Sequence, residues 1–286
     1  MKNPLKKTNN SNFNTGYKKR PFDSYKSLLN QLDEETKQKL DRQRTIGMTI
    51  IVAFVVLLIV ILAVTGIGVD KTQSVSGNLF ADKEHVLIEC FGDSLTEGFQ
   101  VMEEDGELRT GIGEVTYPKE LEQKLTELFA SDGNKYTFTD LTVKNYGQSG
   151  SVLQASSCAR LSGSADIVLI LYTANNFLSG EDYVGTLEAN IETIGKQGGF
   201  VFLLNYPVVE GSPEEDKITQ ANNYIANTAS AYSIPLIDLR SCFSSVSDYA
   251  QEELFGADQV HLTDLGYKLM GDYIAQFLHD YYYAMF

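Results

Sequence analysis

The sequence has little of the chemistry that holds metal sites or disulfide frameworks together. Among its 286 residues there are three cysteines, three histidines and no tryptophan. Three cysteines form at most one disulfide bond, for which Cys158 and Cys242 are the candidates, and their spacing matches no zinc motif. Cys90 lies in a predicted buried strand, where a free thiol acts as a small apolar side chain. We therefore expect no metal, no cofactor and no disulfide scaffold.

Basic residues are scarce outside the N-terminal segment. Residues 1–45 hold 11 of the 23 Lys and Arg but only 5 of the 38 Asp and Glu, so the rest of the chain has a net charge of −21. A domain of that charge repels polyanions, and we expect no nucleic-acid partner. The basic N-terminal segment is predicted to be a solvated tail.

Charged residues are missing altogether from residue 45 to residue 69, where the central sequence is IIVAFVVLLIVILAV. A helix of this length spans about 37 Å, enough to cross a hydrocarbon core of about 30 Å. A cleaved signal peptide has a shorter apolar region nearer the N-terminus, so we predict an uncleaved transmembrane signal anchor. Because Arg42 and Arg44 flank its N-terminal side, the positive-inside rule places residues 1–44 in the cytoplasm and the C-terminal domain outside the cell membrane.

Residues 70–84 are predicted to be a polar linker, and residues 85–286 have the pattern of an α/β domain. Short apolar runs typical of buried parallel strands alternate with segments of helical periodicity. This alternation predicts a parallel sheet with helices on both faces and an active site at the carboxyl ends of its strands. The predicted strands are 85–91, 136–143, 166–171, 200–204 and 234–239, and the predicted helices are 118–129, 183–196, 214–231 and 263–282.

The first predicted strand ends in the sequence Phe-Gly-Asp-Ser-Leu-Thr-Glu-Gly, residues 91–98. One interpretation is a capping box, in which Ser94 and Glu97 satisfy backbone N–H groups at a helix start. The other is a nucleophilic Ser94 on a tight turn above the sheet edge, with its own N–H directed at a bound oxyanion. This segment alone is compatible with both interpretations.

Two further strand ends carry groups that can bind an oxyanion. The sequence Asn-Tyr-Gly-Gln-Ser-Gly, residues 145–150, offers the N–H of Gly147. The sequence Thr-Ala-Asn-Asn, residues 173–176, offers the side-chain amide of Asn175. Glycine and asparagine are also common turn residues, so each segment is equally compatible with a simple turn.

Only one of the three histidines lies in a predicted loop near the strand ends. His85 opens the first strand and His279 belongs to the last helix, whereas His261 precedes that helix in the sequence Asp-Gln-Val-His-Leu-Thr. Asp258, three residues earlier, can hold one imidazole nitrogen while the other faces Ser94. A structural Asp–His pair at the start of a helix is the alternative interpretation.

Together these four segments resemble the sequence blocks of the SGNH, or GDSL-type, hydrolase family. GDSLTEG is similar to the first block, NYGQSG to the second, TANN to the G-x-N-D block and DQVHLTDLGY to the D-x-x-H block. The resemblance extends over residues 86–277. It implies a flavodoxin-like three-layer α/β/α fold with a mostly parallel five-stranded sheet, and hydrolysis of acyl esters without a metal.

The resemblance also implies a role for each matching residue. Ser94 would be the nucleophile, His261 the general base and Asp258 the group that orients it. The oxyanion hole would consist of the Ser94 N–H, the Gly147 N–H and the Asn175 amide.

Two residues of the third block depart from the family pattern. Thr173 stands where the family has glycine, so a side chain there narrows the site or shifts the loop. Asn176 stands where the family has aspartate, which removes a carboxylate that would support Asn175.

The function that these observations favour is that of a membrane-anchored serine esterase outside the cytoplasm. Its substrate would be an acyl ester, acetyl esters among them, on a cell-surface glycan or polymer. A lysophospholipase, a thioesterase and an acyltransferase of the same fold are alternatives with the same chemistry. A non-catalytic binding module is an alternative of another class, against which the intact Ser94, Asp258 and His261 argue.

Overall fold

The computed structural model describes residues 84–132, 140–246 and 251–284. The predicted cytoplasmic tail, the signal anchor and all but the end of the linker (residues 1–83) lie outside these residues. Within the described part of the chain, no helix combines the length and the apolarity that a membrane span requires.

Five strands form one parallel sheet in the order β4-β1-β5-β6-β7. Numbered along the chain, this is the 2-1-3-4-5 order of flavodoxin-like folds, so the predicted parallel five-stranded sheet is confirmed. The winding of the chain reverses between β1 and β5, and ligands bind beside such a switch point. The strands are β1 (His85–Gly92), β4 (Asp140–Gly147), β5 (Ile167–Leu171), β6 (Phe200–Leu204) and β7 (Leu236–Ile237).

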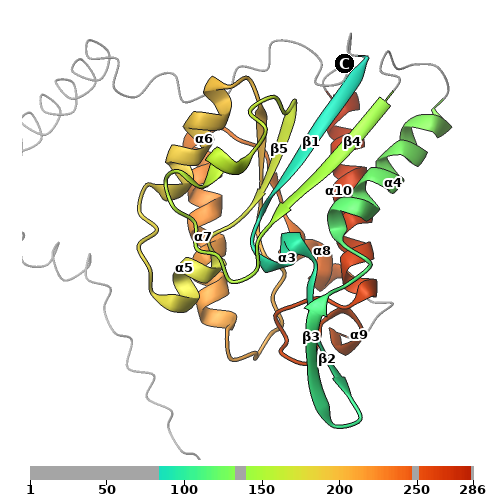
Figure 1. Ribbon diagram of the computed structural model, residues 1–286, viewed down its shortest axis with the longest axis vertical. Helices are drawn as coiled ribbons and strands as arrows, with labels where there is room; N and C mark the ends of the chain where they lie inside the picture. Colours follow the sequence, from blue (N-terminus) through green and yellow to red (C-terminus); the bar gives the residue numbers. More distant parts are fainter. Residues whose placement is uncertain (1–83, 133–139, 247–250, 285–286) are drawn as a thin grey trace, which may run out of the picture. The chain divides into compact units, whose positions relative to one another are not determined.

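Helices cover both faces of this sheet (Figure 1). The helices α4 and α10 pack against each other on one face, and α6 and α7 cover the other, with α5 beside α7. The helical elements are α3 (Ser94–Glu97), α4 (Tyr117–Ser131), η1 (Ser157–Arg160), α5 (Ala174–Ser179), α6 (Thr186–Lys196), α7 (Glu215–Tyr232), α8 (Leu239–Ser245), α9 (Gln251–Leu254) and α10 (Asp264–Ala284).

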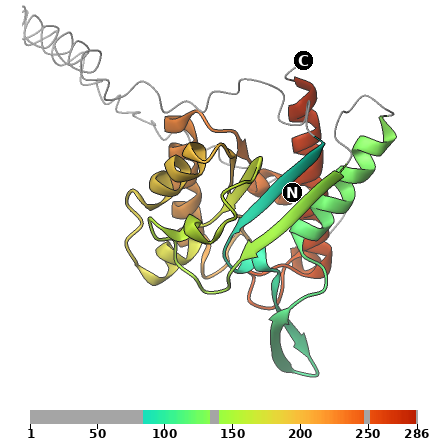
Figure 2. The same cartoon turned by 45° about the horizontal axis from the view of Figure 1, so that its top comes forward.

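An antiparallel hairpin that was not predicted projects beyond the carboxyl ends of the sheet (Figures 1 and 2). It consists of β2 (Phe99–Glu104) and β3 (Glu107–Ile112). Asp105 and Gly106, which join the strands, have positive φ angles of 55° and 79°. Two consecutive residues of this kind make a type I′ turn, for which Asp-Gly is a preferred sequence. This dipeptide is the signal by which the hairpin could have been found.

The second strand of the sheet in chain order ends later than expected. The alternating sequence favoured a strand over 136–143, whereas β4 covers Asp140–Gly147 and residues 133–139 lie outside the described ones. Each residue from Asp140 to Gly147 pairs with one of β1, so pairing with this buried apolar strand determines where β4 ends.

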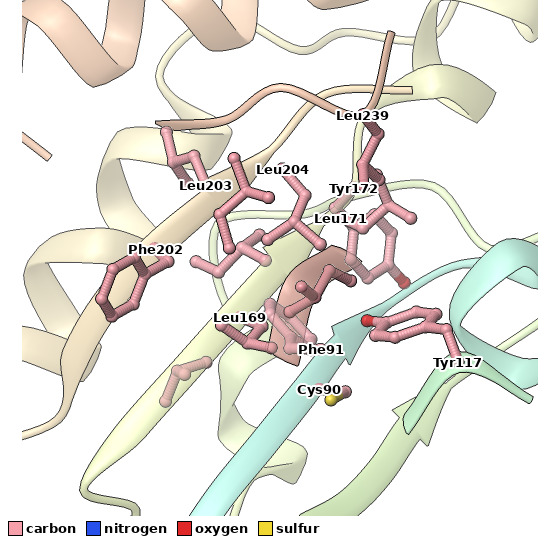
Figure 3. Close-up of a cluster of buried hydrophobic side chains, with 14 of the residues drawn as sticks. Cys90, Phe91, Tyr117, Leu169, Leu171, Tyr172, Phe202, Leu203, Leu204 and Leu239 are labelled. Atoms are coloured by element: carbon pink, nitrogen blue, oxygen red, sulfur yellow. The ribbon is translucent and has the colours of Figure 1, made fainter. Parts of the chain in front are cut away.

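A large cluster of buried apolar side chains packs around the central strands of the sheet. Both β5 and β6 are buried along their whole length, as their continuous apolar runs predicted. Figure 3 shows their side chains packed with Phe91 of β1, Tyr117 of α4 and Leu239 of α8. Cys90 lies in the same cluster, and burial raises the pKa of its thiol well above the ordinary value. It therefore acts as a small apolar side chain, as expected.

The suggested disulfide bond between Cys158 and Cys242 is absent, because all three cysteines are free and buried. Cys158 lies in η1, next to α6, and Cys242 lies in α8, which follows the last strand of the sheet. Each thiol is buried next to its own helix, and burial raises the pKa of both thiols.

Candidate active site

Ser94 is the first residue of α3, directly after β1. The carboxylate of Asp93 caps this helix by accepting a hydrogen bond from the Leu95 N–H at 3.2 Å. The capping-box interpretation is therefore wrong, since Glu97 accepts instead from the Ser149 N–H at 2.6 Å. Capping by Asp93 leaves the Ser94 hydroxyl available for another partner.

That partner is His261. The Ser94 Oγ lies 2.8 Å from His261 Nε2, and His261 Nδ1 lies 2.5 Å from Asp258 Oδ2. The three side chains form one hydrogen-bonded line, in which the imidazole bonds to the Asp258 carboxylate through Nδ1 and to the serine hydroxyl through Nε2. This is the arrangement that a nucleophile, a general base and an orienting carboxylate require.

The loop that carries Asp258 also fixes its carboxylate. Oδ1 accepts hydrogen bonds from the N–H groups of Val260 at 3.1 Å and His261 at 3.0 Å, while Gln259 between them has a positive φ of 58°. Burial by itself raises the pKa of Asp258, but the hydrogen bonds from the His261 ring and from the backbone lower it overall. An ionised carboxylate is thereby held where it can stabilise an imidazolium.

The hairpin supports the imidazole from its other side. Phe99, the first residue of β2, contacts the His261 ring edge-on with the ring centroids 4.9 Å apart. The His261 side chain keeps 16% of its surface exposed. The ring is thus fixed in orientation and still accessible to water or a leaving group.

The second strand end differs from the expectation for Gly147. Its N–H donates to Asn145 Oδ1 at 2.8 Å, so it already has an acceptor. A Cβ at this position would lie 2.0 Å from the Glu97 N, which means that glycine allows β4 to pack against α3. Gly150 has a φ of +69°, and its N–H has no acceptor among the described residues. In this loop, Gly150 rather than Gly147 offers an unused donor.

Asn175 lies at the second position of α5, directly beyond β5. Its Nδ2 donates to the Ser151 carbonyl at 2.9 Å, which leaves one amide hydrogen for a substrate. Ser151 is fixed in turn, because its hydroxyl bonds to the Tyr172 hydroxyl and donates to the Gln148 carbonyl at 2.6 Å. The loop after β4 and the start of α5 are therefore one hydrogen-bonded unit.

Asn176 strengthens that unit although the resemblance implied an aspartate. Its Oδ1 accepts from the Leu153 N–H at 2.9 Å, and its Nδ2 donates to the carbonyls of Leu153 at 3.1 Å and Asp182 at 3.0 Å. A carboxylate cannot donate, so the amide makes bonds here that aspartate lacks.

Thr173 keeps the backbone conformation of the glycine that the resemblance implies. Its φ is 106° and its ψ is −22°, a region that β-branched residues rarely adopt. The side chain is fully buried and its Oγ1 has no hydrogen-bond partner. The backbone therefore stays in a region that favours glycine, and the strain lies beside Asn175.

Sequence reasoning missed a buried connection between α3 and α5. The Tyr206 hydroxyl donates to Asp93 Oδ2 at 2.6 Å and accepts from the Ala174 N–H at 3.3 Å. Burial raises the pKa of Asp93 to about 6, although the hydrogen bonds from Tyr206 and Leu95 and the charge of His261 partly lower it. The only signal in the sequence was the position of Asp93 beside Ser94; Tyr206 gave none.

Arg160 was also missed. Its guanidinium lies 4.9 Å from the centroid of the Phe91 ring and donates to the Gly92 carbonyl at 3.0 Å and to Gln148 Oε1 at 2.7 Å. It thereby joins the end of β1 to the loop after β4, next to Ser94.

The other two histidines lie away from this site. His85 pairs with Asp140 at 3.0 Å, and His279 pairs with Asp132 at 2.7 Å. In the part of the chain that the structure describes, no three His, Cys, Asp or Glu side chains are grouped so as to hold a metal ion. His261 is the histidine that the fold brings to Ser94, where the sequence placed it.

Comparison with known proteins decides the family. The model of the GDSL-like Lipase/Acylhydrolase family matches residues 90–269. The chain belongs to the GDSL-like lipase/acylhydrolase family. As a GDSL acylhydrolase it is a carboxylic-ester hydrolase, and the matched range includes Ser94, Asp258 and His261. No curated relative matches the sequence.

Solved structures of a lipase/acylhydrolase and of another hydrolase show a similar fold. The lipase/acylhydrolase from Enterococcus faecalis has a TM-score of 0.52 and 24% identity over 68% of this chain and 96% of its own. A hydrolase from the metagenome of Lake Arreo, Spain, has a TM-score of 0.53 and 17% identity over 71% of this chain and 98% of its own. At these identities the likeness concerns the fold alone.

Proposed function

We propose that this GDSL acylhydrolase is a membrane-anchored serine esterase that works outside the cytoplasm on short acyl esters, acetyl esters among them, of a cell-surface glycan or polymer. The observation that carries the proposal is the hydrogen-bonded line from Asp258 through His261 to Ser94. It lies beyond the carboxyl ends of a parallel sheet, where such folds bind ligands.

The line supports a two-step acyl transfer. Ser94 Oγ attacks the ester carbonyl carbon while His261 Nε2 takes its proton, and the resulting imidazolium is stabilised by the Asp258 carboxylate. The tetrahedral intermediate collapses as Nε2 returns that proton to the leaving alcohol. Water, activated by the same nitrogen, then attacks the acyl-enzyme and releases the acid and Ser94.

The developing oxyanion needs donors on the opposite side of the carbonyl. The Ser94 N–H, the second amide hydrogen of Asn175 and the Gly150 N–H are the groups that we assign to it. Gly147 remains close by, but its N–H would first have to leave Asn145.

The location outside the cytoplasm rests on the sequence of residues 45–69, which lacks charge and follows Arg42 and Arg44. The test is protease treatment of intact cells that produce the full-length chain. Release of the hydrolase domain by cleavage within residues 70–84 is expected. Protection in intact cells, followed by cleavage after lysis, would reverse the topology.

Acyl length is tested with nitrophenyl esters from acetyl to palmitoyl on the purified full-length protein. We expect kcat/KM to be highest for acetyl and to fall with chain length. A maximum at the long-chain esters would favour the lysophospholipase or thioesterase alternative. Complete inactivity toward every ester would favour the non-catalytic module.

A further inference from the structure

A cavity of about 490 Å³ lies between the β2–β3 hairpin and the segment that carries His261. Its walls come from Val101, Met102 and Glu103 of β2, from the loop after β6, and from residues 252–263. β2 begins at Phe99, whose ring contacts His261, so the cavity starts two residues along the strand from that contact. Its volume is in the range of about 300–1,000 Å³ in which small molecules bind.

The cavity combines an apolar floor with an acidic wall. Val101, Val209 and Phe255 line it and are themselves 8%, 8% and 4% exposed. Glu103 and Glu252 line it as exposed carboxylates, and neither has a hydrogen bond or an ion pair with another described residue. No Lys, Arg or His is among the lining residues.

This lining argues against two kinds of occupant. A long acyl chain would remove water from the two carboxylates without supplying a hydrogen bond, which is unfavourable. An anionic group, such as the phosphate of a lysophospholipid or of a coenzyme, would be repelled by them. The charge of the whole domain acts in the same direction.

A neutral group with several hydroxyls can form favourable contacts with both the polar and the apolar residues of the lining. Its hydroxyls can donate to Glu103 and Glu252 and exchange hydrogen bonds with the Gln259 amide, while its C–H face contacts the apolar floor. A quaternary ammonium is recognised by a cage of aromatic rings, and Phe255 is the single aromatic residue of the lining. Hydroxyls therefore fit the cavity better than such a cation.

We infer that this cavity is the subsite for the alcohol part of the ester, and that it takes a neutral polyhydroxylated alcohol of the sugar class. The inference rests on the proposed function, because an alcohol subsite has meaning only if Ser94 accepts an acyl group. Its specificity-determining residues are Glu103 and Glu252, while Met102 forms part of the wall.

The experiment compares three acetyl esters on the full-length protein: a mono-acetylated methyl glucoside, the matching glucuronide with a carboxylate, and the matching amino sugar with an ammonium. Nitrophenyl acetate serves as a small ester that does not need the cavity. We expect kcat/KM for the glucoside to exceed that for the glucuronide by about tenfold or more, because two carboxylates oppose the third. The amino sugar, whose ammonium the two carboxylates attract, should exceed the glucoside by less than about tenfold, because loss of water from the ammonium offsets part of that attraction.

Two variants with matched controls assign the effect to the cavity. Glu103→Gln combined with Glu252→Gln should raise kcat/KM for the glucuronide by about five- to tenfold. Glu107→Gln, on the opposite face of the same hairpin and outside the lining, should not. Met102→Trp should lower kcat/KM for the glucoside by about tenfold by filling the cavity, whereas Val184→Trp, at an exposed site in the loop before α6, should not.

The outcomes separate this inference from the function on which it rests. Absence of nitrophenyl acetate hydrolysis would refute the esterase itself. Hydrolysis of nitrophenyl acetate with equal rates for the glucoside and the glucuronide would refute the subsite alone. A tenfold preference for the amino sugar would show a cation site and overturn the assignment to a neutral alcohol.

Discussion

The two halves of the active site use their hydrogen bonds differently. Ser94, His261 and Asp258 direct donors and acceptors at one another along the path that a proton must follow. In the other half, the amide of Asn175 and the N–H of Gly147 bond to neighbouring protein groups. In the proposed mechanism, one half holds the reacting groups themselves, and the other mainly holds the loops around the place where an oxyanion would form.

This difference predicts how substitutions in each half should change activity and stability. Removing a group of the first half should remove a step of the proposed reaction, since His261 is the side chain that bonds to the Ser94 hydroxyl among the described residues. Removing a group of the second half weakens binding of the transition-state charge and loosens the loops. Losses in the second half should therefore be smaller and should be accompanied by changes in stability.

The largest effect is expected for His261→Ala, which removes the general base. We predict a loss of at least about 10³-fold in kcat/KM for nitrophenyl acetate, in line with removal of a base from a serine triad. The control is His85→Ala, which changes an exposed histidine paired with Asp140. A loss of less than tenfold in His261→Ala would remove the distinction between the two halves.

The next effect concerns the oxyanion half. Asn175→Ala should lower kcat by about 10²- to 10³-fold with little change in KM, because its donor acts on the transition state. Ser179→Ala, which removes a hydroxyl bonded to the Asn175 carbonyl on the same helix, is the control and should stay within a few-fold of the wild type. If Asn175→Ala changes KM alone, the side chain binds substrate and does not stabilise an oxyanion.

Asp93 links the two halves through the Tyr206 hydroxyl, and it should make the stability of the fold depend on pH. Its folded-state pKa is raised by burial from 3.8 to about 6, so folding favours the protonated carboxyl. That contribution is present below pH 3.8 and is lost as the pH rises to about 6, a change of about 3 kcal/mol. Asp93→Asn, which cannot ionise, should lack this change.

The measurement is urea unfolding of both proteins at intervals from about pH 4 to about pH 7. As the pH rises, the unfolding free energy of the wild type should fall relative to that of Asp93→Asn. The difference between the two proteins should become constant above about pH 6. Parallel curves throughout would mean that the pKa of Asp93 is the same in the folded and the unfolded protein.

The smallest effect is a gain in stability from Thr173→Gly. The change relieves a positive φ and removes a buried hydroxyl without a partner, while glycine adds entropy to the unfolded chain. We expect the unfolding free energy to rise by about 1 kcal/mol and Tm by about 2–4 °C. A decrease of that size would show that the packing of the Thr173 side chain outweighs the strain.

Comparison of sequence and structure shows the same division. Ser94, Asp258 and His261 could be predicted because each lies beside a recognisable strand end or helix start, and because few histidines compete for the role. Tyr206, by contrast, lies 113 residues from Asp93 in sequence, and only the parallel order of β1, β5 and β6 brings the two together. Local patterns carry no information on such a contact.

Gly147 gives a second example of what the sequence alone does not decide. The sequence correctly indicated a glycine at the end of a strand, but two physical reasons for glycine were available: approach of a substrate and approach of α3. The structure shows the second, because a Cβ would meet the Glu97 backbone. Deciding between them needs the position of α3, which depends on tertiary packing. The hairpin of β2 and β3 was missed for a different reason. Its Asp105-Gly106 turn is a local sequence signal that could have been recognised without the tertiary structure.

The central claim is that Ser94 is a nucleophile activated by His261, and covalent labelling tests it most directly. The full-length protein is treated with an alkyl fluorophosphonate, and the intact mass and the labelled peptide are determined by mass spectrometry. We predict one label per chain, located on Ser94, no label in Ser94→Ala, and labelling of His261→Ala slowed by at least about 10²-fold. A label on another residue, or unchanged labelling of Ser94→Ala, would contradict the account.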